Sequence, residues 1–241
     1  MRVYDETYIT EKDDEIEKDE EIDEFADYFK EKTTPKIMMT TSIKPHKNVY
    51  EFLKELKNSI PNLFYYERKQ FRLKSIIQWA KKRDFTDVMI IYEKQGKPHT
   101  MIISHLPKGP TATFKISNVQ VKKDIQHYGN PTEHIPELIL NNFDTRLGHR
   151  IGRMLAALFP QRPEFEGRQV VTLHNQRDFI FFRRHRYDFT KDGQRANLQE
   201  IGPRFTLKLS SLQHGTFDAL FGKYEFSYAP KMGYNRKKFY I

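Results

Sequence analysis

Strict alternation of apolar and polar residues marks one segment of the chain that follows a Gly-Pro pair. After Gly202-Pro203, apolar residues stand at positions 205, 207 and 209, and polar residues stand at positions 204, 206, 208 and 210. A period of two with one apolar face predicts a half-buried β-strand. Residues 109–117 match residues 202–210 at Gly, Pro, Thr, Lys and Ser. We therefore expect two strands of one kind, with Lys115 and Lys208 on their polar faces.

A similar pair of apolar runs precedes each of these strands. Residues 88–92 and 101–103 flank a short turn, and so do residues 170–173 and 179–182. Each pair predicts a β-hairpin. A hairpin followed by a Gly-Pro strand thus occurs twice, which predicts an internal repeat. Chance similarity between two amphipathic strands is the alternative.

The other patterns predict strands and helices in alternation. Apolar runs predict strands at 37–40 and 63–66, and helical spacing of apolar residues predicts helices over 49–56, 73–80 and 147–158. Residues 118–143 are predicted to be a connector with helical pieces. The order of elements predicts an α/β (α+β) domain over residues 35–211, made of related halves at about 35–117 and 118–211.

An acidic segment, residues 1–34, precedes this domain. Ile22, Phe25, Ala26 and Phe29 stand at i, i+3, i+4 and i+7, so a short amphipathic helix is predicted over 19–31. A solvated tail is one interpretation. The other is a segment that docks on a basic partner, or that shields the protein's own basic surface until RNA displaces it.

A tail over residues 212–241 follows the domain. Tyr224, Phe226 and Tyr228 alternate in it, and Arg236, Lys237 and Lys238 come later. Aromatic residues mixed with cations suit RNA or a protein groove. A strand folded back on the body is the alternative. The residues predicted to bind a protein partner are Ile22, Phe25, Phe29, Tyr224, Phe226 and Tyr228.

Charge is distributed unevenly along the 241 residues. Residues 1–31 have a net charge of −10, and the remainder has a net charge of +19. A body this basic favours a polyanionic ligand, and nucleic acid suits it better than a membrane surface because no basic amphipathic helix leaves a bulky apolar face free. The sequence contains no Cys, which excludes disulfides and thiolate chemistry, and no apolar run approaches membrane-spanning length.

Three groups of cations are candidates for contact with RNA. Residues 183–186 are all Arg or His and follow an apolar run, which predicts a strand that leaves the core for solvent. Arg146, Arg150 and Arg153 are spaced along one face of a helix. The third group is on the polar faces of the Gly-Pro strands. The residues predicted to contact RNA are Arg146, Arg150, Arg153, Arg177, Arg183, Arg184, Arg186, Arg204, Lys208, Lys108 and Lys115.

Two of these groups also have a structural interpretation. Ion pairs inside the protein would account for the arginines of 183–186, and a solvated helix face would account for the arginine stripe. The run Lys81-Lys82-Arg83 suits a helix C-terminus and is interpreted as a cap.

Several phrases of the sequence resemble the Brix domain of ribosome assembly factors. They are residues 200–209, 106–111 and 40–42. Further phrases, at 136–143, 147–150, 174–187 and 215–218, resemble one branch of that family. The resemblance runs from about residue 3 to the last residue. Members of this branch usually carry a longer basic extension ahead of the acidic region, so we expect the sequence to be short or trimmed at its start.

The resemblance implies a fold and a function. The fold would be two copies of a module similar to the anticodon-binding domain of some aminoacyl-tRNA synthetases. The role would be maturation of the large (60S) ribosomal subunit in the nucleolus, through binding precursor ribosomal RNA beside a dedicated protein partner and other pre-60S proteins. The family comparison of the Gly-Pro-Arg segment with a bacterial sigma-factor RNA-contact motif implies a contact by Arg204.

Catalysis finds little support in the sequence. The nine His residues show no metal-ligand spacing, and the segment 109–111 lacks the spaced glycines of a phosphate loop. We therefore expect no enzyme activity, cofactor, metal or small-molecule substrate. Two alternatives remain: a protein-interaction module whose basic face binds an acidic partner, and an RNA-processing nuclease, for which no carboxylate pair is evident.

Overall fold

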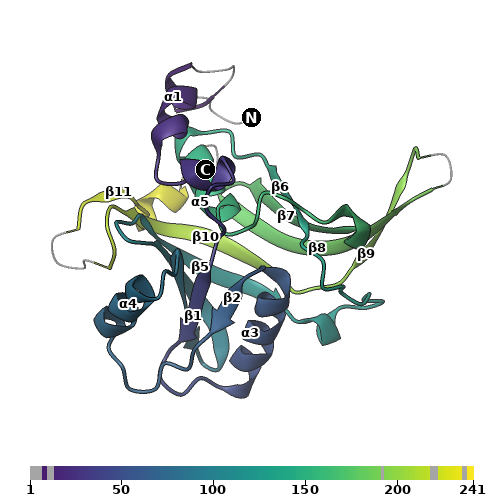
Figure 1. Ribbon diagram of the computed structural model, residues 1–241, viewed down its shortest axis with the longest axis horizontal. Helices are drawn as coiled ribbons and strands as arrows, with labels where there is room; N and C mark the ends of the chain where they lie inside the picture. The colour runs from purple at the N-terminus through teal and green to yellow at the C-terminus, as the bar shows by residue number, and fades with distance from the viewer. Residues whose placement is uncertain (1–6, 10–13, 191–192, 218–221, 235–237) are drawn as a thin grey trace.

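A single eleven-stranded sheet organises the residues that the computed structural model describes, which are 7–9, 14–190, 193–217, 222–234 and 238–241 (Figure 1). The strands are β1 Ile37–Thr41, β2 Leu63–Tyr65, β3 Asp87–Lys94, β4 Lys97–His105, β5 Thr111–Gln120, β6 Glu137–Asn141, β7 Gln169–Gln176, β8 Phe179–Phe189, β9 Ala196–Glu200, β10 Arg204–Gln213 and β11 Tyr224–Ser227. Their order is β2-β1-β3-β4-β5-β10-β8-β7-β6, with β11 beside β10 and β9 beside β8.

Helices cover the two faces of this sheet unequally. The α-helices are α1 Asp14–Ile22, α2 Ala26–Phe29, α3 Lys47–Ser59, α4 Leu73–Lys82 and α5 Arg146–Ala156, with short 3₁₀ turns at Lys122–Asp124, Phe165–Gly167 and Pro230–Tyr234. The apolar sides of α3 and α5 share one large core with the sheet, whereas α4 packs with β1 and β3 in a smaller core on the other face. Figure 1 shows α3 and α4 on opposite sides of β1.

The period-two prediction for the Gly-Pro strands is confirmed. Phe205, Leu207 and Leu209 of β10 are buried in the large core, as are Phe114 and Ile116 of β5. Both predicted hairpins are present, as β3–β4 and β7–β8. Since alternate side chains leave opposite faces of a strand, the polar positions of β5 and β10 face away from α3 and α5.

The two Gly-Pro strands lie side by side, and their pairing joins the sheet in the middle. In the antiparallel register Lys208 lies opposite Lys115, Leu207 opposite Ile116 and Leu209 opposite Phe114. On one side, β3, β4 and β5 are antiparallel and β1 is parallel to β3. On the other, β7, β8 and β10 are antiparallel and β6 is parallel to β7. The matching strand directions on the two sides agree with the prediction that residues 35–117 and 118–211 are related halves, which stays a prediction.

Three local predictions differ from the structure. The connector contains a strand, β6, which the polar residues around it concealed. The helix predicted over 19–31 is two helices, α1 and α2, because Asp23 caps the turn between them by accepting a hydrogen bond from the backbone N–H of Phe25. The tail folds back as β11 against β10, while its cations Arg236 and Lys237 lie outside the described residues.

Arg184 and Phe25 are not the surface residues that were predicted. β8 does not leave the sheet at residue 183 but continues to Phe189, so Arg184 points into the large-core face and is only 2% exposed. Its guanidinium donates to Gln169 Oε1 at 2.7 Å, and burial lowers the pKa of Arg184 to about 10. Phe25 is fully buried beside His105. Neither side chain can meet RNA or a partner without unfolding its surroundings.

The second half of β8 forms an arm with β9. Residues 185–189 of β8 pair with residues 196–200 of β9, beyond the point where β10 pairs with β8. Figure 1 shows this hairpin projecting from the body of the molecule. Phe189 and Leu198 near its tip are exposed. The arm is therefore tied to the body at one end only.

The burial of Arg184 generates a stability prediction. Arg184→Ala should lower the free energy of unfolding by about 2–4 kcal/mol, because it leaves a cavity and removes the donor to the buried Gln169. Arg184→Met should cost less, since it keeps most of the volume and removes a desolvated charge. Urea denaturation is the measurement. Arg186→Ala, two positions along the same strand at a partly exposed arginine, is the control, and an equal loss in both alanine variants would contradict the prediction.

Candidate nucleic-acid interface

The predicted cations are divided between the two faces of the sheet. Lys115, Arg183, Arg204 and Lys208 occupy alternate positions on β5, β8 and β10 that face away from the large core. Arg146, Arg150 and Arg153 belong to α5, which packs on the large-core face. The predicted residues therefore do not form one surface, and each group has its own surroundings.

The acidic segment covers the arginine stripe of α5. Arg153 donates to both carboxylate oxygens of Asp23, at 2.7 and 2.9 Å, and to the backbone oxygen of Glu20 at 2.7 Å. Its guanidinium also lies over the ring of Phe29, 4.4 Å from the centroid. Residues 14–31 are thus docked on the body of the same chain, and the solvated-tail interpretation is wrong for them.

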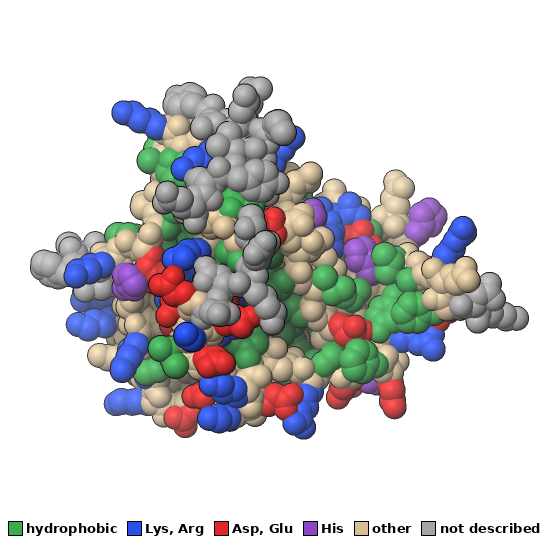
Figure 2. Space-filling model, turned by 90° about the horizontal axis from the view of Figure 1, so that it is seen from above, with side chains coloured by type: hydrophobic (Ala, Val, Ile, Leu, Met, Phe, Trp, Pro, Cys, Tyr) green, Lys and Arg blue, Asp and Glu red, His purple; other side chains and the backbone are tan. Residues whose placement is uncertain are grey.

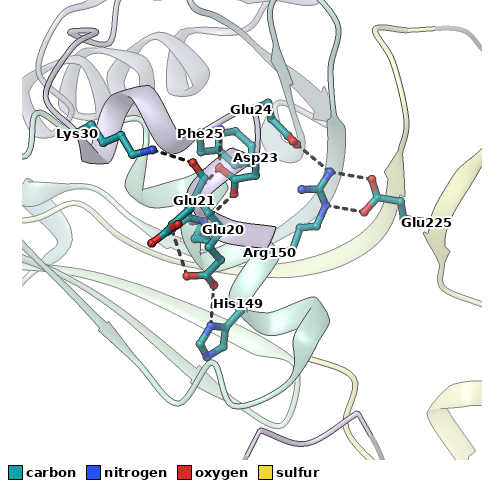
Figure 3. Close-up of polar contacts among 10 residues, drawn as sticks. Glu20, Glu21, Asp23, Glu24, Phe25, Lys30, His149, Arg150 and Glu225 are labelled. Carbon is teal, nitrogen blue, oxygen red and sulfur yellow. Dashed lines mark hydrogen bonds and ion pairs between the residues drawn. The ribbon is translucent and has the colours of Figure 1, made fainter. Parts of the chain in front are cut away.

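Arg150 is held in the same way, between two carboxylates. It donates to Glu225 at 2.7 and 3.0 Å and lies 2.8 Å from Glu24 (Figure 3). Burial by itself would lower the pKa of Arg150, but the hydrogen bonds and charges of Glu225 and Glu24 outweigh it and raise the pKa. This arginine is already neutralised by the protein.

The outer positions of α5 also meet acidic residues. His149 Nδ1 lies 3.0 Å from Glu20, and Arg146 lies 3.6 Å from Glu15. Figure 2, which views the molecule from the side that carries α1, shows acidic and basic side chains close together there. The prediction that α5 offers free cations to RNA is therefore wrong in this arrangement, and displacement of the acidic segment by RNA stays a prediction.

On the other face of the sheet, Lys115 and Lys208 stand directly opposite one another. Like charges at opposite positions of an antiparallel pair repel and destabilise it. Among the described residues neither lysine has a carboxylate partner. Instead, the ammonium of Lys208 lies over the rings of Tyr228 and Phe179, 4.3 and 5.0 Å from their centroids. The pair is a site of uncompensated positive charge next to aromatic faces.

A second cationic pair lies four residues farther along β10. Arg204 donates to Glu200, with Nε 2.7 Å from Oε1, so its charge is compensated. Arg183 donates to the backbone oxygens of Phe182 and Phe205 and lies over the ring of Phe181. Desolvation, and then repulsion from Arg204, lower the pKa of Arg183.

His185 follows on the same face of β8. Desolvation lowers the pKa of its imidazole, and Arg183 and Arg204 lower it further, against the opposing charge of Glu200. An anion bound at this face would favour the charged forms of Arg183 and His185. We name Lys115, Lys208, Arg183 and Arg204, with Phe179 and Phe181, the sheet-face site.

The remaining predicted residues lie apart from this site or at its margin. Arg177 is exposed in the turn between β7 and β8, and Lys108 is exposed in the loop before β5. Arg186 is on the core side of β8, where it reaches the backbone oxygen of Asn130 at 3.5 Å. The tail aromatics separate: Tyr224 is exposed and Phe226 packs against the large core.

The sequence analysis missed a group of residues between β2 and β3. Lys81, Lys82 and Arg83 were assigned to a helix end, and Trp79 was given no role, yet all four are exposed and aromatic side chains lie beside them. The signal was present in the composition, because seven of the 17 residues from 67 to 83 are Lys or Arg and one is acidic.

No group of three or more His, Asp or Glu side chains in the described part of the chain could hold a metal ion. No helix within those ranges is long and apolar enough to cross a membrane.

Comparison with known proteins gives a consistent picture. Residues 42–211 match the family model for the Brix domain. The whole chain is 53% identical to ribosome production factor 1 of Pongo abelii, over 69% of that protein, and 51% identical to a Brix domain-containing protein of Caenorhabditis elegans, over 63% of it. It is 49% identical to ribosome production factor 1 of Saccharomyces cerevisiae, over 79% of that protein.

One solved structure shares the fold at low sequence identity. It is a probable ribosomal biogenesis protein from Aeropyrum pernix K1, with a TM-score of 0.51 and 15% identity. The match covers 72% of this chain and 96% of that one. At this identity the likeness supports the mixed α/β architecture alone.

The docking of the acidic segment generates a prediction about coupling. In a double-mutant cycle of Asp23→Asn and Arg153→Met, the coupling energy should be about 1–2 kcal/mol, because the pair is bidentate and largely buried. The exposed pair Glu15 and Arg146 is the control, and its coupling should be below about 0.5 kcal/mol. Urea denaturation of each set measures both energies. Equal coupling in the two cycles would argue against docking of residues 20–24.

Proposed function

The chain belongs to the Brix domain family, and from this we propose that it is a ribosome assembly factor that binds precursor ribosomal RNA of the large (60S) subunit. The observation that carries the RNA-binding part is the pair Lys115 and Lys208, two lysines in direct opposition without a carboxylate partner among the described residues. The names of its relatives support the ribosomal part of the proposal.

The chemistry of the sheet-face site suits a nucleic-acid backbone. Lysine ammonium groups and the partly exposed hydroxyl of Ser117 on the same strand faces are groups that contact phosphate and sugar. Phe179 and Phe181 add apolar rings on which unpaired bases can stack. A phosphate placed between Lys115 and Lys208 would remove the repulsion between them, so binding and stability favour the same arrangement.

The mechanism that we propose is scaffolding without catalysis. The site holds cations, aromatic rings and hydroxyls, and Glu200, its carboxylate, is occupied by Arg204. Binding would hold a segment of precursor RNA against the sheet while the rest of the particle assembles, in the nucleus and its nucleolus. A dedicated protein partner and other pre-60S proteins would bind elsewhere, with Ile22 and Tyr224 as exposed candidates for contact.

A second candidate function is an interaction module for an acidic protein. The observation in its favour is that α5 already binds an acidic protein segment, through Asp23, Glu24 and Glu20. On this alternative, RNA would be incidental. Nuclease treatment of the isolated complex separates the two, because a protein-mediated complex survives it.

The lysine pair generates the central prediction of this proposal. Lys115→Gln combined with Lys208→Gln should weaken binding to single-stranded RNA. The slope of log K against log salt should become shallower by about 1.4, since two phosphate contacts are lost. The free energy of unfolding should not fall, because a repulsion is removed. Fluorescence anisotropy with a labelled oligonucleotide at several salt concentrations measures the first effect.

A matched control comes from α3, on the opposite face of the sheet. Lys54→Gln combined with Lys57→Gln makes the same change in charge at two exposed positions. Those variants should keep most of the affinity. If both double variants lose the same affinity, net charge rather than the sheet-face site determines binding, and the proposed site is wrong.

A further inference from the structure

An apolar cavity opens between β1 and α4, away from the sheet-face site. Its volume is about 410 Å³, and its wall includes Met38, Tyr66, Phe71, Ile76 and Trp79. A volume of this size is in the range of about 300–1,000 Å³ found for small-molecule sites. The cavity lies at the edge of the sheet, because β2 pairs only with β1 among the described strands.

The aromatic rings at this cavity are exposed, although they have the size of core residues. Trp79 is 40% exposed, and Tyr66 and Phe71 are exposed to a similar degree. Phe71 and Trp79 meet edge to face, with centroids 4.8 Å apart. Edge-to-face packing holds the rings in place and leaves ring faces free. Free, fixed aromatic faces are the usual platform for unpaired bases.

A buried hydroxyl in the wall of the cavity lacks a hydrogen-bond partner. Thr40 lines the cavity, is 1% exposed, and its Oγ1 forms no hydrogen bond within the described part of the chain. A buried hydroxyl without a hydrogen-bond partner costs about 1–3 kcal/mol of folding free energy, so such groups are uncommon in folded proteins. The hydroxyl can donate and accept, which suits the polar edge of a base entering the cavity.

Two cations in the wall of the cavity lack carboxylate partners, and further unpaired cations stand on the same segment of the chain, of which Lys74 and Lys81 line a different pocket. Those on the segment between β2 and β3 are Lys69, Arg72, Lys74, Lys81, Lys82 and Arg83, all exposed and none in an ion pair with another described residue. Arg83 and Lys69 line the cavity itself, where Glu67 is the carboxylate. The arginines of α5 are compensated by the chain's own acidic segment, whereas these cations are left free for an external anion.

We propose that this cavity binds an unpaired base of single-stranded RNA, with the base against Trp79 and Phe71 and its polar edge toward Thr40. The flanking phosphates would meet Arg83 and Lys69. The inference rests on the proposed RNA-binding function and adds to it a second contact, separate from the sheet-face site. An apolar protein segment would fill the cavity as well, but it would leave Arg83 and Lys69 in its wall without anions, and charge complementarity favours RNA.

The test uses the fluorescence of Trp79, which is the single Trp of the chain. Titration of the full chain with a single-stranded RNA oligonucleotide should quench it, because a stacked base deactivates the indole. Inorganic polyphosphate of matched charge should bind without quenching, since it has no base. Polyglutamate should leave the signal unchanged. Quenching by polyglutamate as strong as by RNA would overturn the proposal in favour of a protein ligand.

Variants test the contribution of the wall to affinity. Phe71→Ala and Trp79→Leu should each weaken binding of the same oligonucleotide about tenfold, by anisotropy. Thr40→Val removes the hydroxyl at constant shape and should weaken binding several-fold without lowering the urea midpoint. Phe165→Ala, at another exposed ring outside the cavity wall, is the control and should bind normally.

The outcomes separate this inference from the function on which it rests. RNA that binds with unchanged Trp79 fluorescence, and with equal affinity for the Phe71→Ala variant, would overturn the cavity site and leave the proposed function standing. Absence of any RNA binding by the full chain would overturn the proposed function and the inference together. Quenching that persists in the Lys115→Gln, Lys208→Gln variant supports a contact independent of the sheet face.

Discussion

The pairing of β5 with β10 is the constraint on which the rest of the structure depends. Without it the sheet would be two smaller sheets, each with an open edge where β5 or β10 now finds its neighbour. Its register places Lys115 opposite Lys208, two residues that match each other in the repeated Gly-Pro phrase. The same hydrogen bonds that close the sheet therefore create the charged pair on its surface.

The cations on the two faces of the sheet differ in their partners. On the α5 face the chain supplies its own carboxylates, and Arg150 and Arg153 have the geometry of satisfied ion pairs. On the other face Lys208 meets aromatic rings, and Lys115 and the cations near Trp79 are exposed to solvent. The net charge of the chain does not distinguish these surfaces. Only the positions of the acidic residues in space decide which cations are available to a ligand.

The sequence was a good guide wherever a short-range rule applied. Period two set the faces of β5 and β10, and the helical spacing of apolar residues predicted the helix that is α5. It failed where the outcome depends on contacts across the chain. The residues around position 184 do not show that its guanidinium donates a hydrogen bond to Gln169, which lies on another strand. The hydrogen bonds from Arg153 to Asp23 join residues 130 positions apart in the sequence. Hence the fold was predictable and most of the candidate site was not.

The hairpin of β8 and β9 has a mechanical consequence. β8 is one continuous strand of 11 residues, about 36 Å long, that begins at Phe179 beside Lys208 and ends at Phe189 on the arm. β7 pairs with β8 as far as Arg186, so Arg183 and His185 lie in the part of the strand that the sheet holds, and the arm is the continuation of that part. The exposed tip of the arm and the cations of the sheet-face site on β8 are therefore parts of one continuous strand, and a partner bound to the arm would be joined to that site through backbone alone.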